Sequence, residues 1–263
     1  MGTATALLAE GDVRRALDVV IDPELDEPIT DLGFVRSVKL GAGRVEVHLR
    51  LPTSFCAPNF AYLMASDAKD AVTGLVGTGT GTVVVVELDD HHDSVIINTG
   101  LAADAGYRGT FGHEAEQDLD ELRATFRRKA HTAAMERVLT RLLRSCPDLV
   151  ESEMGSVVLA DLPDDEVTAS LVRHRTAVGL DDNPGSPVLV DEHGVPYPAD
   201  QVPLALRRAR STRISIDGNA HFCRGLLRTR YPESGEDQAP RAEETFFPLS
   251  ALTHTSRQQE QIA

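Results

Sequence analysis

The chain has 263 residues, 41% hydrophobic and 25% charged, which is the composition of a globular protein with one large or two small domains. Its formal net charge of −15 argues against a nucleic-acid partner, because contacts to the phosphate backbone dominate that kind of affinity. The sequence lacks an apolar run long enough to span a membrane and a secretory signal pattern, and its three scattered cysteines do not suggest a disulfide framework, so we expect a cytoplasmic protein.

The first predicted element is a helix over residues 8–21. Val13, Leu17 and Val20 recur at the spacing that places side chains on one face of a helix. The helix is expected to end at Asp22-Pro23, because proline disfavours the α conformation in the residue before it.

A β-hairpin is predicted next, from alternating apolar and polar residues over 34–39 and 44–51 around a glycine turn at 41–43. A helix is expected over 58–72, since its proline suits a first turn, and a β-branched run predicts a buried strand over 82–88. This order of elements, α-β-β-α-β, predicts a compact α/β sandwich with a mixed three-stranded sheet.

A polar, glycine-containing connection is predicted over residues 89–116, with one strand at 94–98. Residues 117–145 then form a long amphipathic helix that ends before Pro147. Because Cys146 continues the apolar spacing of this helix, we expect it to pack in a core.

The remainder of the chain is predicted to mix both kinds of element. Strands are expected over 156–160, 187–191 and 212–217, helices over 166–179 and 203–210, and a helical or coiled piece over 219–229. The polar, proline-containing segment 232–244 is expected to be mobile.

The overall prediction is an α/β protein in three parts. These are a small α-β-β-α-β domain over 1–100, a connection and long helix over 101–147, and a second α/β domain over 148–263.

Three short motifs lie in the first of these parts. They are Asp22-Pro23-Glu24, then Asp31-Leu32-Gly33, and then Thr53 and Cys56 after the second hairpin strand. In this order and spacing they resemble the SUF-associated metal–sulfur cluster assembly domain family, of the phenylacetate ring-oxygenase maturation and cytosolic iron–sulfur targeting types. The resemblance covers residues 10–90 and implies the α/β fold, with Cys56 as the functional thiol.

The chain departs from the family pattern in two ways. The family has Cys-Pro where this sequence has Cys56-Ala57-Pro58, which moves the helix start by one residue. Family members also end soon after the third strand, whereas this chain continues to residue 263. The fold prediction is independent of both differences.

The position of Cys56 also has a physical interpretation. Pro58 marks the first turn of a helix, whose unpaired N–H groups and dipole favour a thiolate, the form that binds metals. The alternative is a cysteine that packs as a small apolar side chain. One cysteine supplies only one of the about four ligands of a cluster, so a second thiol or histidine, a second subunit or the client must complete any site.

His221 and Cys223 form a second candidate group. In an extended segment these two side chains would point to the same side and could provide two metal ligands. The alternative is a packed Cys223 with His221 at the surface. The groups His91-His92-Asp93 and His113-Glu114 have suitable residue types but no metal-ligand spacing.

Arg207, Arg208 and Arg210, with Arg213, make a basic cluster on an acidic protein. This cluster is predicted to be a docking patch for an acidic partner, or else a solvated face that pairs with carboxylates of the same chain. The region 148–263 would then recognise the client.

The resemblance implies a non-catalytic maturation factor that helps a metalloenzyme acquire iron or an iron–sulfur cluster, with a multi-subunit di-iron monooxygenase as a plausible client. No tightly bound cofactor is expected, and iron or a cluster would be held only transiently. One alternative is an enzyme with Cys56 as nucleophile and a base such as His221. The other is a metal-free folding chaperone or scaffold.

Overall fold

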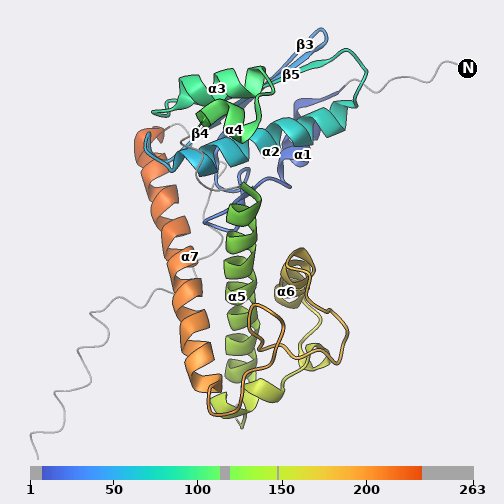
Figure 1. Cartoon of the computed structure of the whole chain (residues 1–263), viewed down its shortest axis with the longest axis vertical. Helices are drawn as coiled ribbons and strands as arrows, with labels where there is room; N and C mark the ends of the chain where they lie inside the picture. Colours follow the sequence, from blue (N-terminus) through green and yellow to red (C-terminus); the bar gives the residue numbers. More distant parts are fainter. Residues whose placement is uncertain (1–7, 113–118, 147, 233–263) are drawn as a thin grey trace, which may run out of the picture.

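The computed structural model describes residues 8–112, 119–146 and 148–232. The N-terminal part is a small mixed α/β unit that sits on one end of two long antiparallel helices (Figure 1). The α/β fold class is therefore confirmed. Within the described ranges, no helix combines the length and the apolar character needed to cross a membrane.

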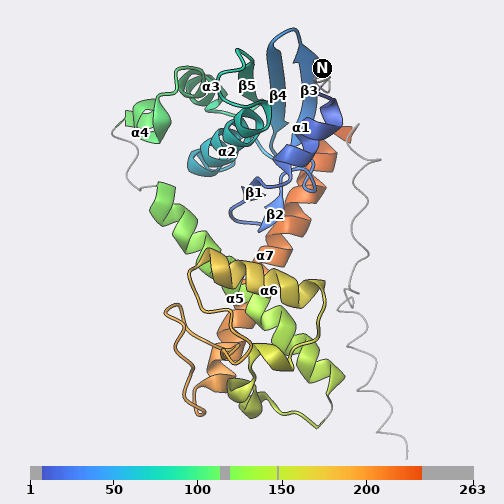
Figure 2. The same cartoon turned by 90° about the vertical axis from the view of Figure 1, so that its right-hand side faces the viewer.

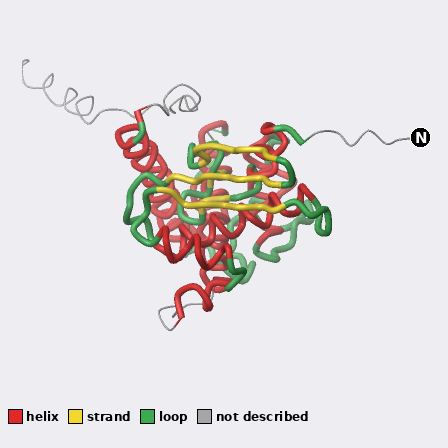
Figure 3. Tube along the Cα trace, turned by 90° about the horizontal axis from the view of Figure 1, so that it is seen from above, coloured by secondary structure: helices red, strands yellow, loops and turns green. Residues whose placement is uncertain are grey.

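The central sheet has three strands in the order β3-β4-β5. β3 (Val35–Gly41) pairs antiparallel with β4 (Arg44–Arg50), which pairs parallel with β5 (Val83–Asp89). α2 (Pro58–Val76) is the crossover between the two parallel strands. The strands lie side by side along one side of the helices (Figure 3), and the predicted mixed three-stranded sheet is confirmed.

The hairpin forms where the alternation predicts it. Val45, Val47 and Leu49 are each at most 2% exposed, whereas the residues between them point to the other face. Gly43 takes a φ of 70° in the turn, a conformation that costs glycine little. The pattern and the turn thus specify the same register.

The elements before the sheet differ in length from the prediction. α1 (Glu10–Leu17) is shorter than residues 8–21, because the chain turns into a two-residue strand, β1 (Ile21–Asp22), that pairs with β2 (Glu27–Pro28). α2 begins at Pro58 as expected but continues past residue 72.

The segment predicted as a strand at 94–98 is a helix, α3 (Ser94–Ala102), so that prediction is wrong. Its buried residues, Ile97 and Leu101, are four apart, which is the spacing of a helix face. The Asn98 side chain pairs with both backbone groups of Leu88, at 2.9 and 3.2 Å, and so anchors the helix to the end of β5. A short helix, α4 (Gly106–Phe111), follows.

The long helix α5 (Leu119–Ser145) agrees with the prediction, but Cys146, just beyond it, is exposed rather than packed in a core. Two 3₁₀ turns follow, η2 (Glu151–Ser156) and η3 (Leu159–Asp161), and then α6 (Glu166–Ala177).

Residues 202–230 form one continuous helix, α7 (Val202–Arg230), which runs antiparallel to α5 (Figures 1 and 2). The predicted strand at 212–217 is therefore wrong, and the short helix predicted before it and the helical or coiled piece predicted after it are parts of one helix. The other two predicted strands are wrong as well: residues 156–160 and 187–191 take part only in isolated bridges. The segment 233–244 and the pair His113-Glu114 lie outside the described residues.

Two hydrophobic clusters make up the interior, and α7 contributes to both. The first lies between the sheet, α1 and α2, and includes Ala220, Leu227 and Tyr231. The second joins α5, α6 and the 3₁₀ turns to the first half of α7. The C-terminal end of α7 thus belongs to the core of the N-terminal unit.

Candidate functional site

Cys56 lies in the short turn between β4 and α2, one residue before the helix cap. Its side chain is half-buried, and its Sγ lies 3.5 Å from the hydroxyl of Thr53. The same hydroxyl accepts a hydrogen bond from the backbone N–H of Phe55, at 3.2 Å. Thr53 therefore both shapes the turn and contacts the thiol.

The loop after β5 supports the turn from one side. The buried His91 has its Nε2 2.8 Å from the carbonyl oxygen of Cys56, and its Nδ1 accepts from the backbone N–H of Asp93 at 3.1 Å. With Nδ1 as the acceptor, Nε2 carries the proton and donates to Cys56. The backbone N–H of His92 donates to the carbonyl of Ser54 at 2.9 Å. Sequence reasoning missed this role for His91, which depends on a contact between two loops.

The end of α7 supports the turn from the other side. The Arg230 guanidinium donates to the carbonyl of Leu51 at 3.1 Å and to the hydroxyl of Ser54 at 2.8 Å, and it also donates to the carbonyl of Asp90. The Tyr231 hydroxyl donates to the Asp90 carboxylate at 3.1 Å. A residue far along the chain therefore ties the Cys56 turn to the loop after β5.

Asp22 and Glu24, from the first motif, form the neighbouring turn. The buried Asp22 carboxylate accepts hydrogen bonds from the backbone N–H groups of Glu24 and Leu25, both at 2.9 Å. Burial raises the pKa of Asp22 to about 6, because these two bonds offset only part of the cost of desolvating its charge. Pro23 is partly buried in the same turn.

The second motif shapes the start of the sheet. Gly33 is buried with a φ of 77°, and its carbonyl accepts from the Arg50 side chain at 3.2 Å. Asp31, at the start of that turn, is exposed.

α7 lies against this region through a face that contains Cys223. One turn before Cys223, the Asn219 amide donates to the Glu24 carboxylate at 3.2 Å. Burial, followed by the negative charges of Cys56, Asp22 and Glu24, raises the pKa of the Cys223 thiol to about 11. The structure therefore places Cys223 near enough to Cys56 for the two thiols to interact electrostatically.

His221 is exposed and does not share this face. Because His221 and Cys223 are two residues apart on a helix, their side chains point to different sides. The extended geometry predicted for this pair is therefore wrong. Over the described ranges of the chain, no three His, Cys, Asp or Glu side chains form a group that could hold a metal ion.

The predicted basic patch lies at the other end of α7. Arg207 and Arg208 are exposed, but Arg210 and Arg213 both bond to the carboxylate of Glu136, which is 1% exposed on α5. Half of the cluster therefore pairs with a carboxylate of the same chain. At about 1.5 Å of helix per residue, Arg207 is roughly 35 Å along α7 from Arg230.

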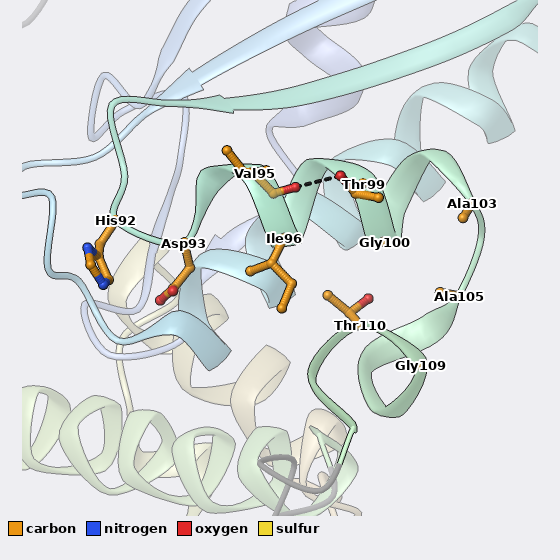
Figure 4. Close-up of a pocket in the computed structure, with 10 residues that line it drawn as sticks. All are labelled: His92, Asp93, Val95, Ile96, Thr99, Gly100, Ala103, Ala105, Gly109 and Thr110. Carbon is orange, nitrogen blue, oxygen red and sulfur yellow. Dashed lines mark hydrogen bonds between the residues drawn. The ribbon is translucent and has the colours of Figure 1, made fainter.

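A groove of about 650 Å³ lies beside the Cys56 turn, between α3 and α4. Figure 4 shows Ile96 and Thr110 in the space between these helices, with His92 at the end of the groove. The ring of His92 is 5.8 Å from that of Phe55, the residue before Cys56. Phe55 and Val95 are 81% and 78% exposed, so apolar surface adjoins the thiol.

Comparison with known proteins bears on the part of the chain that holds Cys56. Residues 10–85 match the model of a family described as "Iron-sulfur cluster assembly protein". Proteins named "Iron-sulfur cluster carrier protein" from Mycobacterium bovis and Mycobacterium tuberculosis are 40% identical over 79 residues, which is 29% of this chain and 19% of theirs. The chain therefore spans about a fifth of the length of the curated relatives it matches. No solved structure gives a significant match.

These matches support an iron–sulfur cluster assembly domain family for residues 10–85. Cys56, both motif turns, β3, β4 and the first three residues of β5, up to Val85, lie inside that range. The helices α5, α6 and α7 lie outside it.

Proposed function

We propose that this protein carries iron or an iron–sulfur cluster to a client enzyme and that Cys56 is the thiol that holds this cargo. The observation that carries the proposal is the construction of the Cys56 turn. Its backbone is fixed by His91, His92 and Arg230, and its sulfur contacts the hydroxyl of Thr53 in the same turn. The names of the relatives support a role in cluster delivery.

A single fixed thiol suits a carrier. Iron–sulfur clusters are held by about four protein ligands, so one cysteine contributes a minority of them, and the others come from a donor or a client. Transfer is then an exchange of thiolate ligands at iron, with no change of oxidation state. A rigid turn keeps the sulfur in place during this exchange, because its backbone groups are already bonded within the protein.

The apolar groove beside the thiol is proposed as the place where the client docks. Cargo that passes directly between thiols requires the client to contact the surface around Cys56, and Phe55, Val95 and Ile96 supply exposed apolar side chains there. Exposed apolar patches of this kind commonly mark protein-binding sites. A di-iron monooxygenase as this client, and a cytoplasmic location where thiols stay reduced, remain parts of the same proposal.

The alternative of a cysteine-nucleophile enzyme needs a base at the sulfur. The hydrogen-bonding partner of the Cys56 sulfur, among the described residues, is a hydroxyl rather than an imidazole. His91 faces the carbonyl oxygen of Cys56, and His221 lies on the exposed side of α7. The geometry favours the carrier over the enzyme.

The test is transfer of a cluster to an apo-ferredoxin acceptor. The full-length protein is loaded with iron and sulfide, desalted and mixed with the acceptor, and holo-ferredoxin is followed by circular dichroism. We expect transfer from the wild type and from Cys146→Ser, and loss of transfer from Cys56→Ser. Transfer from Cys56→Ser at the wild-type rate would overturn the proposal.

A further inference from the structure

We propose that Cys223 is a second sulfur ligand for the cargo, so that Cys56 and Cys223 together form a two-thiolate site for one iron of a cluster. This site would close across the junction between the N-terminal unit and α7. The inference rests on the proposed function, because it assigns the cargo of the same thiol.

The register of α7 places Cys223 toward the Cys56 turn. Asn219, Cys223, Leu227 and Arg230 follow one another at spacings of four, four and three, which is one face of a helix. Leu227 is 1% exposed in the first hydrophobic cluster, which confirms that this face is turned inward.

Contacts fix this face on both sides of Cys223. On one side, Asn219 bonds to Glu24, and on the other, Arg230 bonds to Ser54, two residues before Cys56. Both cysteines are partly buried and pack against the same cluster of apolar residues. Cys223 thus lies between two residues of α7 that are bonded to the Asp22 turn and to the Cys56 turn.

A metal cation suits the chemistry of these two side chains. Its binding would displace one proton from each thiol as the two metal–sulfur bonds form.

Two thiolates are half of the about four that a cluster takes, which matches one iron of a two-iron cluster. The other iron would keep its ligands from the donor or accept those of the client. The chain would therefore hold the cargo more firmly than one thiol can, while half of the cluster remains open to exchange.

The experiment is a titration of the reduced full-length protein with Cd²⁺, whose sulfur-to-metal charge-transfer absorption reports the number of bound thiolates. We expect two thiolates per ion in the wild type. Cys223→Ser should halve the absorption and weaken binding by roughly tenfold or more, which is the scale of change when a metal site is altered. Cys223→Ala serves as a second variant, and a circular-dichroism melt shows that each variant is folded.

His221→Ala and Cys146→Ser are the matched controls, and both should bind Cd²⁺ as the wild type does. Unchanged thiolate count and affinity in Cys223→Ser and Cys223→Ala would overturn the inference. If Cys56→Ser has also lost transfer to apo-ferredoxin, that result leaves the proposed function in place. Wild-type transfer from Cys56→Ser would instead remove both.

Discussion

Among the described residues, each half of the molecule contains one buried carboxylate, and the pKa values of these two carboxylates are shifted in opposite directions. Asp22, beside the Cys56 turn, is 7% exposed, and burial raises its pKa to about 6. Glu136, in the helical half, is 1% exposed; burial alone would raise its pKa, but hydrogen bonds from Thr140, Arg213 and Arg210 lower it below its usual value. The difference lies in the partners: backbone N–H groups for Asp22, and two arginines for Glu136.

The contrast distinguishes a buried carboxylate that stabilises the fold from one that lies at the candidate functional site. In the helical half, a buried charge is neutralised by its neighbours and locks α5 to α7. In the N-terminal half, the buried carboxylate of Asp22, which accepts hydrogen bonds from backbone N–H groups, lies near the Cys223 thiol. Local departures from the most stable arrangement are expected at functional sites.

The largest predicted effect is a loss of stability caused by a substitution in the helical half. Arg213→Ala leaves Glu136 buried with one arginine fewer, and the loss of a partner from a buried ion pair costs roughly 3 kcal/mol or more. Urea denaturation at neutral pH measures this loss. Arg207→Ala, an exposed position on the same helix, is the control and should change stability by about 0.5 kcal/mol at most. Equal effects of the two substitutions would show that the Glu136 pairing does not hold the helices together.

The lowered pKa of Glu136 also predicts how the stability of the protein changes in acid. Because the pKa of Glu136 is lowered on folding, its contribution is present above the pKa of the unfolded chain and is lost as the pH falls through the folded value. Glu136→Gln should therefore flatten the acid limb of the stability curve. A curve of unchanged slope below pH ~4 would contradict this assignment.

The second effect concerns the link between α7 and the thiol. Arg230→Met removes the donors to Leu51, Ser54 and Asp90, and we expect a loss of about 1–3 kcal/mol, since the partly buried acceptors of Leu51 and Ser54 lose their donor. The Cys56 turn should also loosen, so its alkylation by iodoacetamide should be faster than in the wild type. Arg207→Met is the matched control. Alkylation of Cys56 at the wild-type rate would show that α7 does not restrain the turn.

The third predicted effect is a gain in stability. Asp22→Asn keeps an oxygen that accepts from Glu24 and Leu25 but removes the buried charge, so the free energy of unfolding at pH 7 should rise by about 1–3 kcal/mol. A raised carboxyl pKa contributes stability that is full below the unfolded pKa and lost as pH rises through about 6, so the wild type should weaken between pH ~4 and ~6 relative to the variant. Thermal melts across this range check the sign.

The smallest predicted effect on stability comes from substitutions beside the groove between α3 and α4. Phe55→Ser and Val95→Ser change highly exposed residues, so the free energy of unfolding should shift by no more than about 0.5 kcal/mol. If a client docks there, each should nevertheless slow cluster transfer to that client. Val195→Ser, an exposed apolar position in the helical half, is the control. Transfer unaffected by both groove variants would place the docking surface elsewhere, with the exposed Arg207 and Arg208 next to be tested by charge reversal.

The N-terminal fold could be predicted because its signals are local. Alternation over 44–51, the turn at Gly43 and the proline at the start of α2 each act within a few residues. The continuous helix α7 could not be predicted, because Thr212, Ile214 and Ile216 follow the alternating pattern of a strand. The segment is helical because α7 packs along α5, to which Arg210 and Arg213 bond through Glu136.

The candidate site likewise has one part that the sequence predicts and another part that it does not predict. Cys56 was found from its motif and the adjacent helix start. The roles of His91 and Arg230 were not, because each acts across a long separation, 35 residues from His91 to Cys56 and 179 from Arg230 to Leu51. Contacts of that range leave no spacing pattern in the sequence.

The central claim is that the cargo is held at Cys56, and one measurement on the unaltered protein tests it most directly. The full-length protein is labelled with iodoacetamide before and after loading with iron and sulfide, and mass spectrometry gives the labelling rate of each cysteine. The account predicts that loading protects Cys56 and leaves the exposed Cys146 equally reactive. A loaded protein in which Cys56 is labelled as fast as before, or in which Cys146 is the protected residue, would contradict it.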